Sequence, residues 1–140
     1  MEPVSQTSWR EAIQISILHD ANPMVKLVRW TEIETEHLNP LLERQFISTA
    51  GVTLARFLLR KGVVVPEHSH PNEQLAYVLE GALRFTVAGE TMVVRAGEVL
   101  CIPPNVPHQA EALEDTIDLD VFVPSRADWE GGGSGYLREK

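Results

Sequence analysis

The chain has 140 residues, the length of one domain, and 44% of them are hydrophobic, which is too high a share for a disordered polymer. Its 20 acidic and 12 basic side chains give a formal net charge of -8, which argues against the basic surface that nucleic-acid binding requires. The N-terminus has no basic start followed by an apolar run, and no stretch approaches the roughly 20 apolar residues of a membrane span, so we expect a cytoplasmic protein that binds neither nucleic acid nor membrane.

The first fifty residues give the weakest structural signal. Residues 8–18 fit a short helix and a strand equally well, because their apolar side chains satisfy both periods. We expect strands over 26–33 and 44–51, with a bend at Asn39 and Pro40 between them. These two strands would extend the sheet that the rest of the chain predicts.

From Val52 onward the sequence alternates short apolar runs with turn residues, a pattern typical of an all-β sandwich or barrel. Glycine, proline, asparagine and aspartate mark the breaks between the runs, and no helix fits between them. We expect strands over 52–60, 63–65, 74–80, 83–88, 90–95, 98–103, 108–113 and 116–123.

Two arginines in the first of these strands are candidate ligands for an anion. Arg56 and Arg60 are four residues apart, so they share one face of an extended strand. If that face lines a cavity, both favour an anionic small molecule, and Arg60 is a candidate substrate-binding residue. The alternative is that one arginine caps the mouth of the barrel and the other is solvated.

The chain has a single cysteine, Cys101. One cysteine excludes an intramolecular disulfide and a cysteine-rich zinc site. Its apolar neighbours Leu100 and Ile102 predict that Cys101 is a buried small side chain.

Polar side chains concentrate in the stretch HSHPNEQ. His68, His70 and Gln74 are separated by even numbers of residues, so an extended backbone places them on one face. His108 heads a later strand, directly after the proline-rich turn PPNVP. Three imidazoles and one oxygen donor that converge inside a barrel form a site for one divalent transition metal, such as Zn, Ni, Mn, Fe or Cu. The alternative is a surface strand without a ligand role.

Two stretches resemble the motifs of the cupin superfamily, whose members are small jelly-roll β-barrels. The motifs have the forms G-x5-H-x-H-x3-E-x6-G and G-x5-P-x-G-x2-H-x3-N. The matching positions are Gly62, His68, His70, Gln74 and Gly81 in the first and Gly97, Pro103, Asn105, His108 and Ala112 in the second. Every spacing is kept, and the departures are Gln74 for Glu, Asn105 for Gly and Ala112 for Asn. The resemblance implies an all-β jelly-roll barrel over 44–124, an N-terminal arm over 1–43 and a tail over 125–140.

Gln74 stands where most of that family has Glu. A carboxamide oxygen is neutral, so three imidazoles and Gln74 leave a bound ion its full +2 charge and make it a stronger Lewis acid. Such a site suits polarising a carbonyl or enol oxygen at least as well as activating dioxygen. His19 and His37 lie outside both motifs, and we expect neither to bind metal.

The stretches HSHPNEQ, YVLEG, PPNVPH and LDVFVPSRADW resemble the cupins that linearise unsaturated uronates released from pectin and alginate. The D-x-F-x3-R segment of those cupins matches Asp120, Phe122 and Arg126. The resemblance implies that Asp120 is the catalytic acid or base, that Arg126 holds a substrate carboxylate, and that Phe122 lies against the substrate. Alternatively, Phe122 is a core residue and Arg126 pairs with Asp128 at the surface. We also expect one of Asp118 and Asp120 to be a solvated edge residue.

The sequence thus predicts a metal-dependent enzyme, isomerase-like or lyase-like, that acts on a small anionic carbonyl or carboxylate compound of carbohydrate metabolism. Ring opening of an unsaturated uronate is the leading reaction. Three alternatives stay open: a metal-dependent dioxygenase, a cyclase of aromatic polyketides with a broad apolar cavity, and a non-catalytic sensor of a small ligand. Cupin barrels of this length usually pair, so the resemblance also implies a homodimer in which the apolar residues of the N-terminal arm take part.

Overall fold

The computed structural model describes residues 25–130 and 134–138, and no helix in that part of the chain is long and apolar enough to cross a membrane. The described residues before Ile33 belong to a separate unit and contain one 3-10 turn, η1 (Trp30–Glu32). The strand expected over 26–33 is therefore wrong. A segment with alternating apolar residues forms a stable strand only where another strand pairs with it. In this segment Leu27 is 83% exposed. Residues 8–18 lie outside the described residues.

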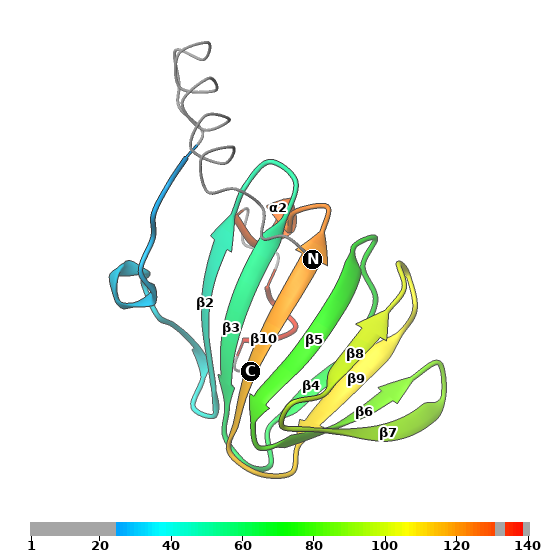
Figure 1. Cartoon of the computed structure of the whole chain (residues 1–140). Coiled ribbons are helices and arrows are strands. Elements are labelled where there is room, and N and C mark those ends of the chain that lie inside the picture. The colour runs from blue at the N-terminus through cyan, green and yellow to red at the C-terminus, as the bar shows by residue number, and fades with distance from the viewer. Residues whose placement is uncertain (1–24, 131–133, 139–140) are drawn as a thin grey trace, which may run out of the picture. The chain divides into compact units, whose positions relative to one another are not determined.

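Within the described residues, ten strands form two antiparallel sheets (Figure 1). The six-stranded sheet has the order β1-β2-β3-β10-β5-β8, and the four-stranded sheet has the order β4-β9-β6-β7. The strands are β1 (Glu36–Asn39), β2 (Leu42–Ser48), β3 (Thr53–Leu59), β4 (Val64–His68), β5 (Glu73–Glu80), β6 (Ala82–Val87), β7 (Glu90–Arg95), β8 (Val99–Ile102), β9 (His108–Ala112) and β10 (Thr116–Val123). This arrangement confirms the all-β fold and is consistent with a jelly roll.

Most predicted strands are present, with ends that shift by at most three residues. The strand expected over 44–51 begins earlier, at Leu42, and pairs with β1, which the sequence did not predict. Asn39 and Pro40 do form the bend, but it joins β1 to β2. Asn39 holds this turn, because its side-chain oxygen accepts a hydrogen bond of 2.9 Å from the Leu41 amide.

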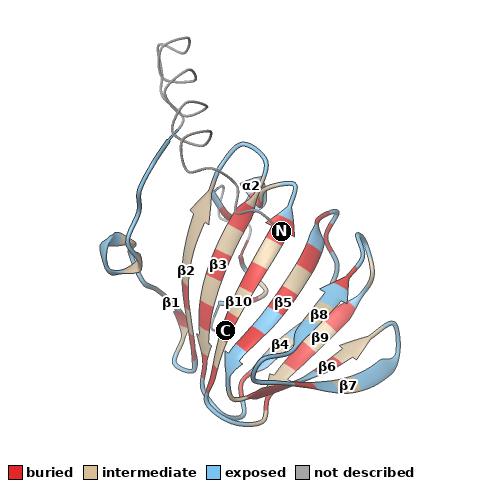
Figure 2. Ribbon diagram, viewed as in Figure 1, coloured by how far each residue is buried: buried red, intermediate tan, exposed pale blue. Residues whose placement is uncertain are grey.

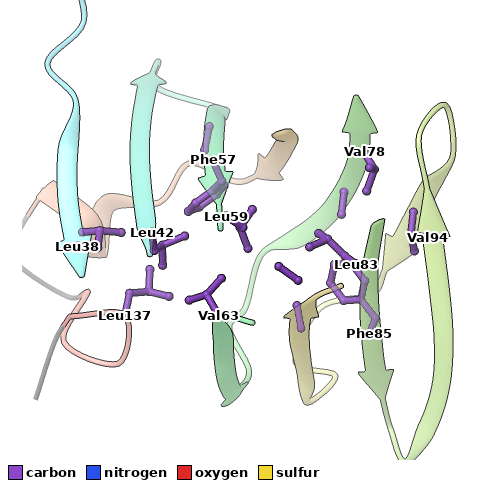
Figure 3. Packing of buried hydrophobic residues seen from close by; sticks show 14 of the residues in the cluster. Leu38, Leu42, Phe57, Leu59, Val63, Val78, Leu83, Phe85, Val94 and Leu137 are labelled. Atoms are coloured by element: carbon purple, nitrogen blue, oxygen red, sulfur yellow. The ribbon is translucent and has the colours of Figure 1, made fainter. Parts of the chain in front are cut away.

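The core lies between the sheets and is filled by alternate residues of each strand. Buried and partly buried positions alternate strictly along β3 and β9, and Figure 2 shows the same banding on β3 and β10. Figure 3 shows Phe57 and Leu59 of β3 in the same core as Leu83 and Phe85 of β6. The strands therefore have a defined inner face, which decides which polar side chains reach the interior.

Cys101 is exposed, so the prediction that it is buried is wrong. It pairs with Leu75 across β5 and β8, and the next inward position of β8 is the fully buried Ile102. The apolar neighbours of Cys101 are real, but the alternation of the strand turns Cys101 itself outward.

A short helix, α2 (Ala127–Glu130), follows β10 and anchors the C-terminal part of the chain on the barrel. Trp129 is its buried residue and packs edge-to-face against Phe46, Phe57 and Phe122. Beyond the residues that are not described, Leu137 is also buried in the core.

Gly81, between β5 and β6, is the glycine at which a side chain is expected to do most damage. Its φ is +89°, and a Cβ there would lie 2.8 Å from Thr116 Cα and still closer to the Asp115 carbonyl oxygen. We expect Gly81→Ala to lower the free energy of unfolding by about 3 kcal/mol or more, measured by denaturant titration.

Gly89→Ala is the matched control for this variant. Gly89 has a similar φ of +84°, but a Cβ there would meet no atom within 4 Å. Only the cost of the left-handed backbone applies, and we expect about 1–2 kcal/mol. Equal losses in the two variants would contradict the predicted clash with the Asp115 to Thr116 backbone.

Candidate metal centre and surrounding cavity

The three motif histidines converge on one point. His68 ends β4 and His108 begins β9, and the two residues are directly paired across these strands. His70 lies in the loop that follows β4 and is buried. One ring nitrogen from each histidine lies within 4.8 Å of the others, so the cluster could hold a metal ion. The geometric part of the sequence prediction, three imidazoles that meet inside the barrel, is present.

The backbone orients each imidazole in the same way. The Nδ1 atoms donate to the carbonyl oxygens of Pro66, Asn72 and Val106, at 2.7, 3.1 and 2.8 Å for His68, His70 and His108 respectively. A carbonyl oxygen only accepts, so the proton of each neutral ring is on Nδ1 and the lone pair is on Nε2. This is the second-sphere arrangement of histidines that bind metal. Moreover, His108 Nε2 is buried and has no hydrogen-bond partner.

The same three rings are held in the neutral form that metal ligation requires. Burial, with smaller contributions from His108, His70 and Arg126, lowers the pKa of His68 to about 4. Burial also lowers the pKa of His70 and of His108, with the nearby Arg126 charge as an additional cause. All three therefore present free lone pairs at neutral pH.

Gln74 completes the donor set from β5. Its Oε1 lies 3.0 Å from His70 Nε2, while its Nε2 donates to Asp120 at 3.2 Å. Because His70 Nδ1 carries the proton, its Nε2 presents a lone pair toward the Gln74 side chain, and a cation between His70 Nε2 and Gln74 Oε1 would be bound by both atoms. Two ligands about 2.1 Å from one ion and at right angles to each other are separated by about 3.0 Å, so the observed distance suits coordination.

Two asparagines fix the loops that carry the ligands. The backbone carbonyl oxygen of Asn72 accepts a hydrogen bond from His70 Nδ1. The side-chain amide of Asn72 donates to the carbonyl oxygens of Pro124 and Ser125. Asn105 has a φ of +63° and donates its amide to the His70 carbonyl oxygen at 2.8 Å. Asparagine is among the few residues that tolerate this backbone region, which explains how it replaces the glycine of the cupin motif.

Asp118 and Asp120 both point into the barrel, and the expectation that one of them is solvated is wrong. They are two residues apart, so they share the inner face of β10, and both are buried. Asp120 pairs across the sheet with Ala55 and Ala76, whose small side chains leave room for its carboxyl group.

The two carboxyl groups share a hydrogen bond and are strongly perturbed. Burial raises the pKa of Asp118 to about 6. Burial, followed by repulsion from Asp118, raises the pKa of Asp120 well above its usual value. Two carboxylates this close in a buried site cannot both be ionised, so the pair retains a proton near neutral pH. The even spacing of Asp118 and Asp120 in the sequence indicates that both side chains share one face of the strand. The expectation that one of them is solvated did not take this spacing into account.

Arg126 is buried rather than at the surface. Its Nε and Nη2 donate to both carboxylate oxygens of Asp128, at 3.0 and 2.9 Å, and its guanidinium lies over the Phe122 ring at 4.8 Å. The backbone amide of Arg126 donates to the Thr53 hydroxyl at 2.8 Å, which fixes the residue to the end of β3. Phe122 is 2% exposed and its ring centroid lies 5.5 Å from that of His70. Both residues therefore line the site.

Arg60 is not brought to the site. It follows the far end of β3, about 20 Å along the strand from Thr53. Its exposed side chain lies 3.4 Å from Asp115. The inner face of β3 carries the odd-numbered residues, so the even-numbered Arg56 and Arg60 face away from the cavity.

Two hollows meet at the imidazoles. The inner cavity, about 50 Å³, is lined by His68, Gln74, His108, Asp118, Asp120 and Arg126 together with apolar side chains. The outer depression, about 510 Å³, is lined by His68, His70, Asn72, Arg126 and Asp128. Tyr136, from the C-terminal segment, lines both hollows. Tyr136 lies outside both sequence motifs, and nothing local in the sequence shows its contact with His68, which is more than sixty residues away.

The sequence model of the cupin domain family matches residues 55–123, which include His68, His70, Gln74 and His108 but not Arg126. In a comparison with curated proteins, the chain is 31% identical over 71 residues to the pectin degradation protein KdgF of Dickeya dadantii, covering 49% of this chain and 64% of that protein. It is 37% identical over 78 residues to the polyketide synthase CurC of Streptomyces cyaneus, covering 53% of this chain and 51% of that protein. The chain therefore spans between half and two thirds of the length of these relatives.

A solved structure gives a similar result over more of the chain. The structure of KdgF from Halomonas sp. superposes with a TM-score of 0.71 at 26% identity, covering 76% of this chain and 99% of that chain. The likeness therefore extends over more of the chain than the residues that the family model matches.

Proposed function

Because the chain belongs to the cupin superfamily, we propose that it is a metal-dependent enzyme that opens and tautomerises a small anionic sugar, with an unsaturated uronate as the substrate. The observation that carries the metal is the cluster of His68, His70 and His108, whose ligand atoms lie within 4.8 Å of one another and whose Nδ1 atoms are all held by backbone carbonyl oxygens. His68, His70, Gln74 and His108 would hold the ion. When bound, the ion would supply Lewis-acid polarisation of a carbonyl or enol oxygen.

The residues around the imidazoles support proton transfer. Opening a cyclic hemiacetal moves one proton from the anomeric hydroxyl to the ring oxygen, and conversion of the resulting enol to a ketone moves one from oxygen to carbon. Both steps need a group that gives and takes a proton near neutral pH. Asp120 lines the inner cavity, and its Oδ1 is buried without a partner while Gln74 holds its other oxygen. We assign the proton transfer to Asp120.

Arg126 supports an anionic substrate. Asp128 occupies its Nε and Nη2, which leaves Nη1 to donate to a substrate carboxylate. The pairing also holds the guanidinium in one orientation over Phe122 and Trp129. The similarity to two KdgF proteins, one of them described as a pectin degradation protein, is the reason for choosing a uronate.

A cyclase of aromatic polyketides is the second candidate. The similarity to the polyketide synthase CurC and the aromatic residues of the cavity, Phe57, Phe85 and Phe122, favour it. The inner cavity of about 50 Å³ is too small for either kind of substrate and does not separate the two candidates, so the similarity to two KdgF proteins is what favours the uronate.

Ring opening is tested by adding the metal-loaded protein to an unsaturated uronate and following the proton NMR spectrum. We expect the linear keto form to appear at least about 100-fold faster than without protein, and the acceleration to be lost after chelation. Oxygen consumption is recorded in the same sample. Oxygen uptake without ring opening would favour a dioxygenase, and an unchanged spectrum would contradict the proposed reaction.

A further inference from the structure

Tyr136 stands between the two hollows of the site. It lines both the inner cavity and the outer depression, and its ring centroid lies 4.5 Å from that of His68 at an interplanar angle of 34°. Arg126 lines the same two hollows, and against the effect of burial Asp128 and the nearby Tyr136 raise the pKa of its guanidinium. The ring therefore covers one candidate ligand, and the hydroxyl lies beside the candidate anion-binding side chain.

The segment that carries Tyr136 is anchored on both sides of that residue. Ser134 and Leu137 are buried, and Leu137 lies close to Leu38 and Leu42 in the core (Figure 3). The Asn39 side-chain amide donates to the Leu137 carbonyl oxygen at 3.0 Å. The position of the Tyr136 ring is thus set by contacts with the first hairpin of the barrel, which makes it part of the site wall.

The volumes show what this wall restricts. The inner cavity of about 50 Å³ has room for a few water molecules, whereas the outer depression of about 510 Å³ is large enough for a sugar. His68 and His70 line the outer depression, whereas Gln74, His108 and Asp120 line only the inner cavity, and Tyr136 and Arg126 line both hollows.

We propose that Tyr136 is a specificity-determining residue that lies over His68 between the outer depression and the inner cavity, so that only a small or slender anionic group reaches His108, Gln74 and Asp120. Its ring sets the size limit, and its hydroxyl adds a second donor beside Arg126. The size limit on a substrate rests on the proposed function, whereas the covering of His68 does not.

The covering is tested on the metal-free protein with diethyl pyrocarbonate, which carbethoxylates neutral imidazoles. Mass spectrometry gives the rate at His68 relative to that at His37, an exposed histidine of β1. We expect Tyr136→Ala to raise this ratio at least about fivefold and Tyr136→Leu, which retains apolar packing, to raise it about twofold. Tyr136→Phe keeps the ring and should leave the ratio unchanged.

Tyr77→Ala is the matched control, because Tyr77 is the other tyrosine of the chain and lies 40% exposed on β5. It should leave the ratio at the wild-type value. Thermal unfolding of each variant shows whether it is folded. An unchanged His68 ratio in both folded Tyr136→Ala and Tyr136→Leu would overturn the proposal.

The size limit is tested on cobalt-loaded protein, whose visible spectrum reports ligands that enter the metal site. Acetate and benzoate are the probes. We expect Tyr136→Ala to bind benzoate at least about tenfold more tightly than wild type, with a smaller change for acetate, and Tyr136→Phe to weaken acetate about threefold. Equal benzoate affinity in wild type and Tyr136→Ala would contradict the size limit. If the wild type does not bind cobalt, the proposed function fails, while the carbethoxylation result still decides the role of Tyr136.

Discussion

His108→Ala is expected to lower the affinity of the protein for Zn²⁺ by at least about 100-fold, since even residues that only support a metal ligand contribute about 10- to 100-fold. His108 Nε2 is buried without a partner, and its Nδ1 is held by the Val106 carbonyl oxygen. The variant removes the Nε2 lone pair of His108 from a cluster whose ligand atoms lie within 4.8 Å of one another. Isothermal titration calorimetry and elemental analysis of the purified protein measure the loss.

His37→Ala is the control for this prediction. His37 is an exposed residue of β1, 3.4 Å from Glu43 and outside the cluster, so its removal should leave Zn²⁺ affinity at the wild-type value. Thermal unfolding gives a second measurement. Zn²⁺ at 100 times its dissociation constant should stabilise the wild type and His37→Ala by about 2.7 kcal/mol, but not His108→Ala. Equal stabilisation of all three proteins would end the case for a histidine metal centre.

Asp120→Asn is expected to lower the rate of ring opening by about 10²- to 10⁴-fold and to leave Zn²⁺ affinity nearly unchanged. The asparagine has the same shape and its side-chain oxygen still accepts the hydrogen bond from Gln74, so the amide oxygen of Gln74 keeps its direction toward His70. What is lost is the group that gives and takes a proton. NMR rate measurements and calorimetry on the same preparation separate the two effects.

Asp118→Asn is the matched control, because Asp118 lies on the same face of β10 and is equally buried but does not contact Gln74. We expect a loss of less than about tenfold, caused by the altered environment of Asp120. If Asp120→Asn turned over at the wild-type rate, Asp120 would not be the catalytic acid or base. A wild type that binds the uronate without converting it would instead favour the sensor interpretation.

Most strands and the metal cluster could be predicted because they depend on short-range spacing. Alternation with period two marks an inner and an outer face along each strand, and His68, His70 and Gln74 follow it. The cupin motif supplied His108, whose pairing with His68 across β4 and β9 is a long-range contact. The same rule applied correctly to Asp118 would have placed it beside Asp120.

The errors have a common origin in contacts that the local sequence does not show. Residues 26–33 have the alternation of a strand, but no strand is present there. Cys101 lies between apolar residues, yet the alternation of β8 turns it outward. Arg60 has the right charge for a substrate ligand, but it follows the end of β3 that lies away from the imidazoles.

The sequence by itself determined the strand pattern, the cupin motifs and the donor set of the metal centre, because each depends on residue types at fixed spacings along an extended chain. Tertiary structure alone decided that Arg126 is buried against Phe122 and that Tyr136 lies against His68. These contacts depend on which strands pair and on where the C-terminal segment docks. Side chains from distant parts of the chain meet only when burial of the whole core makes up for the entropy lost in closing the long loops between them.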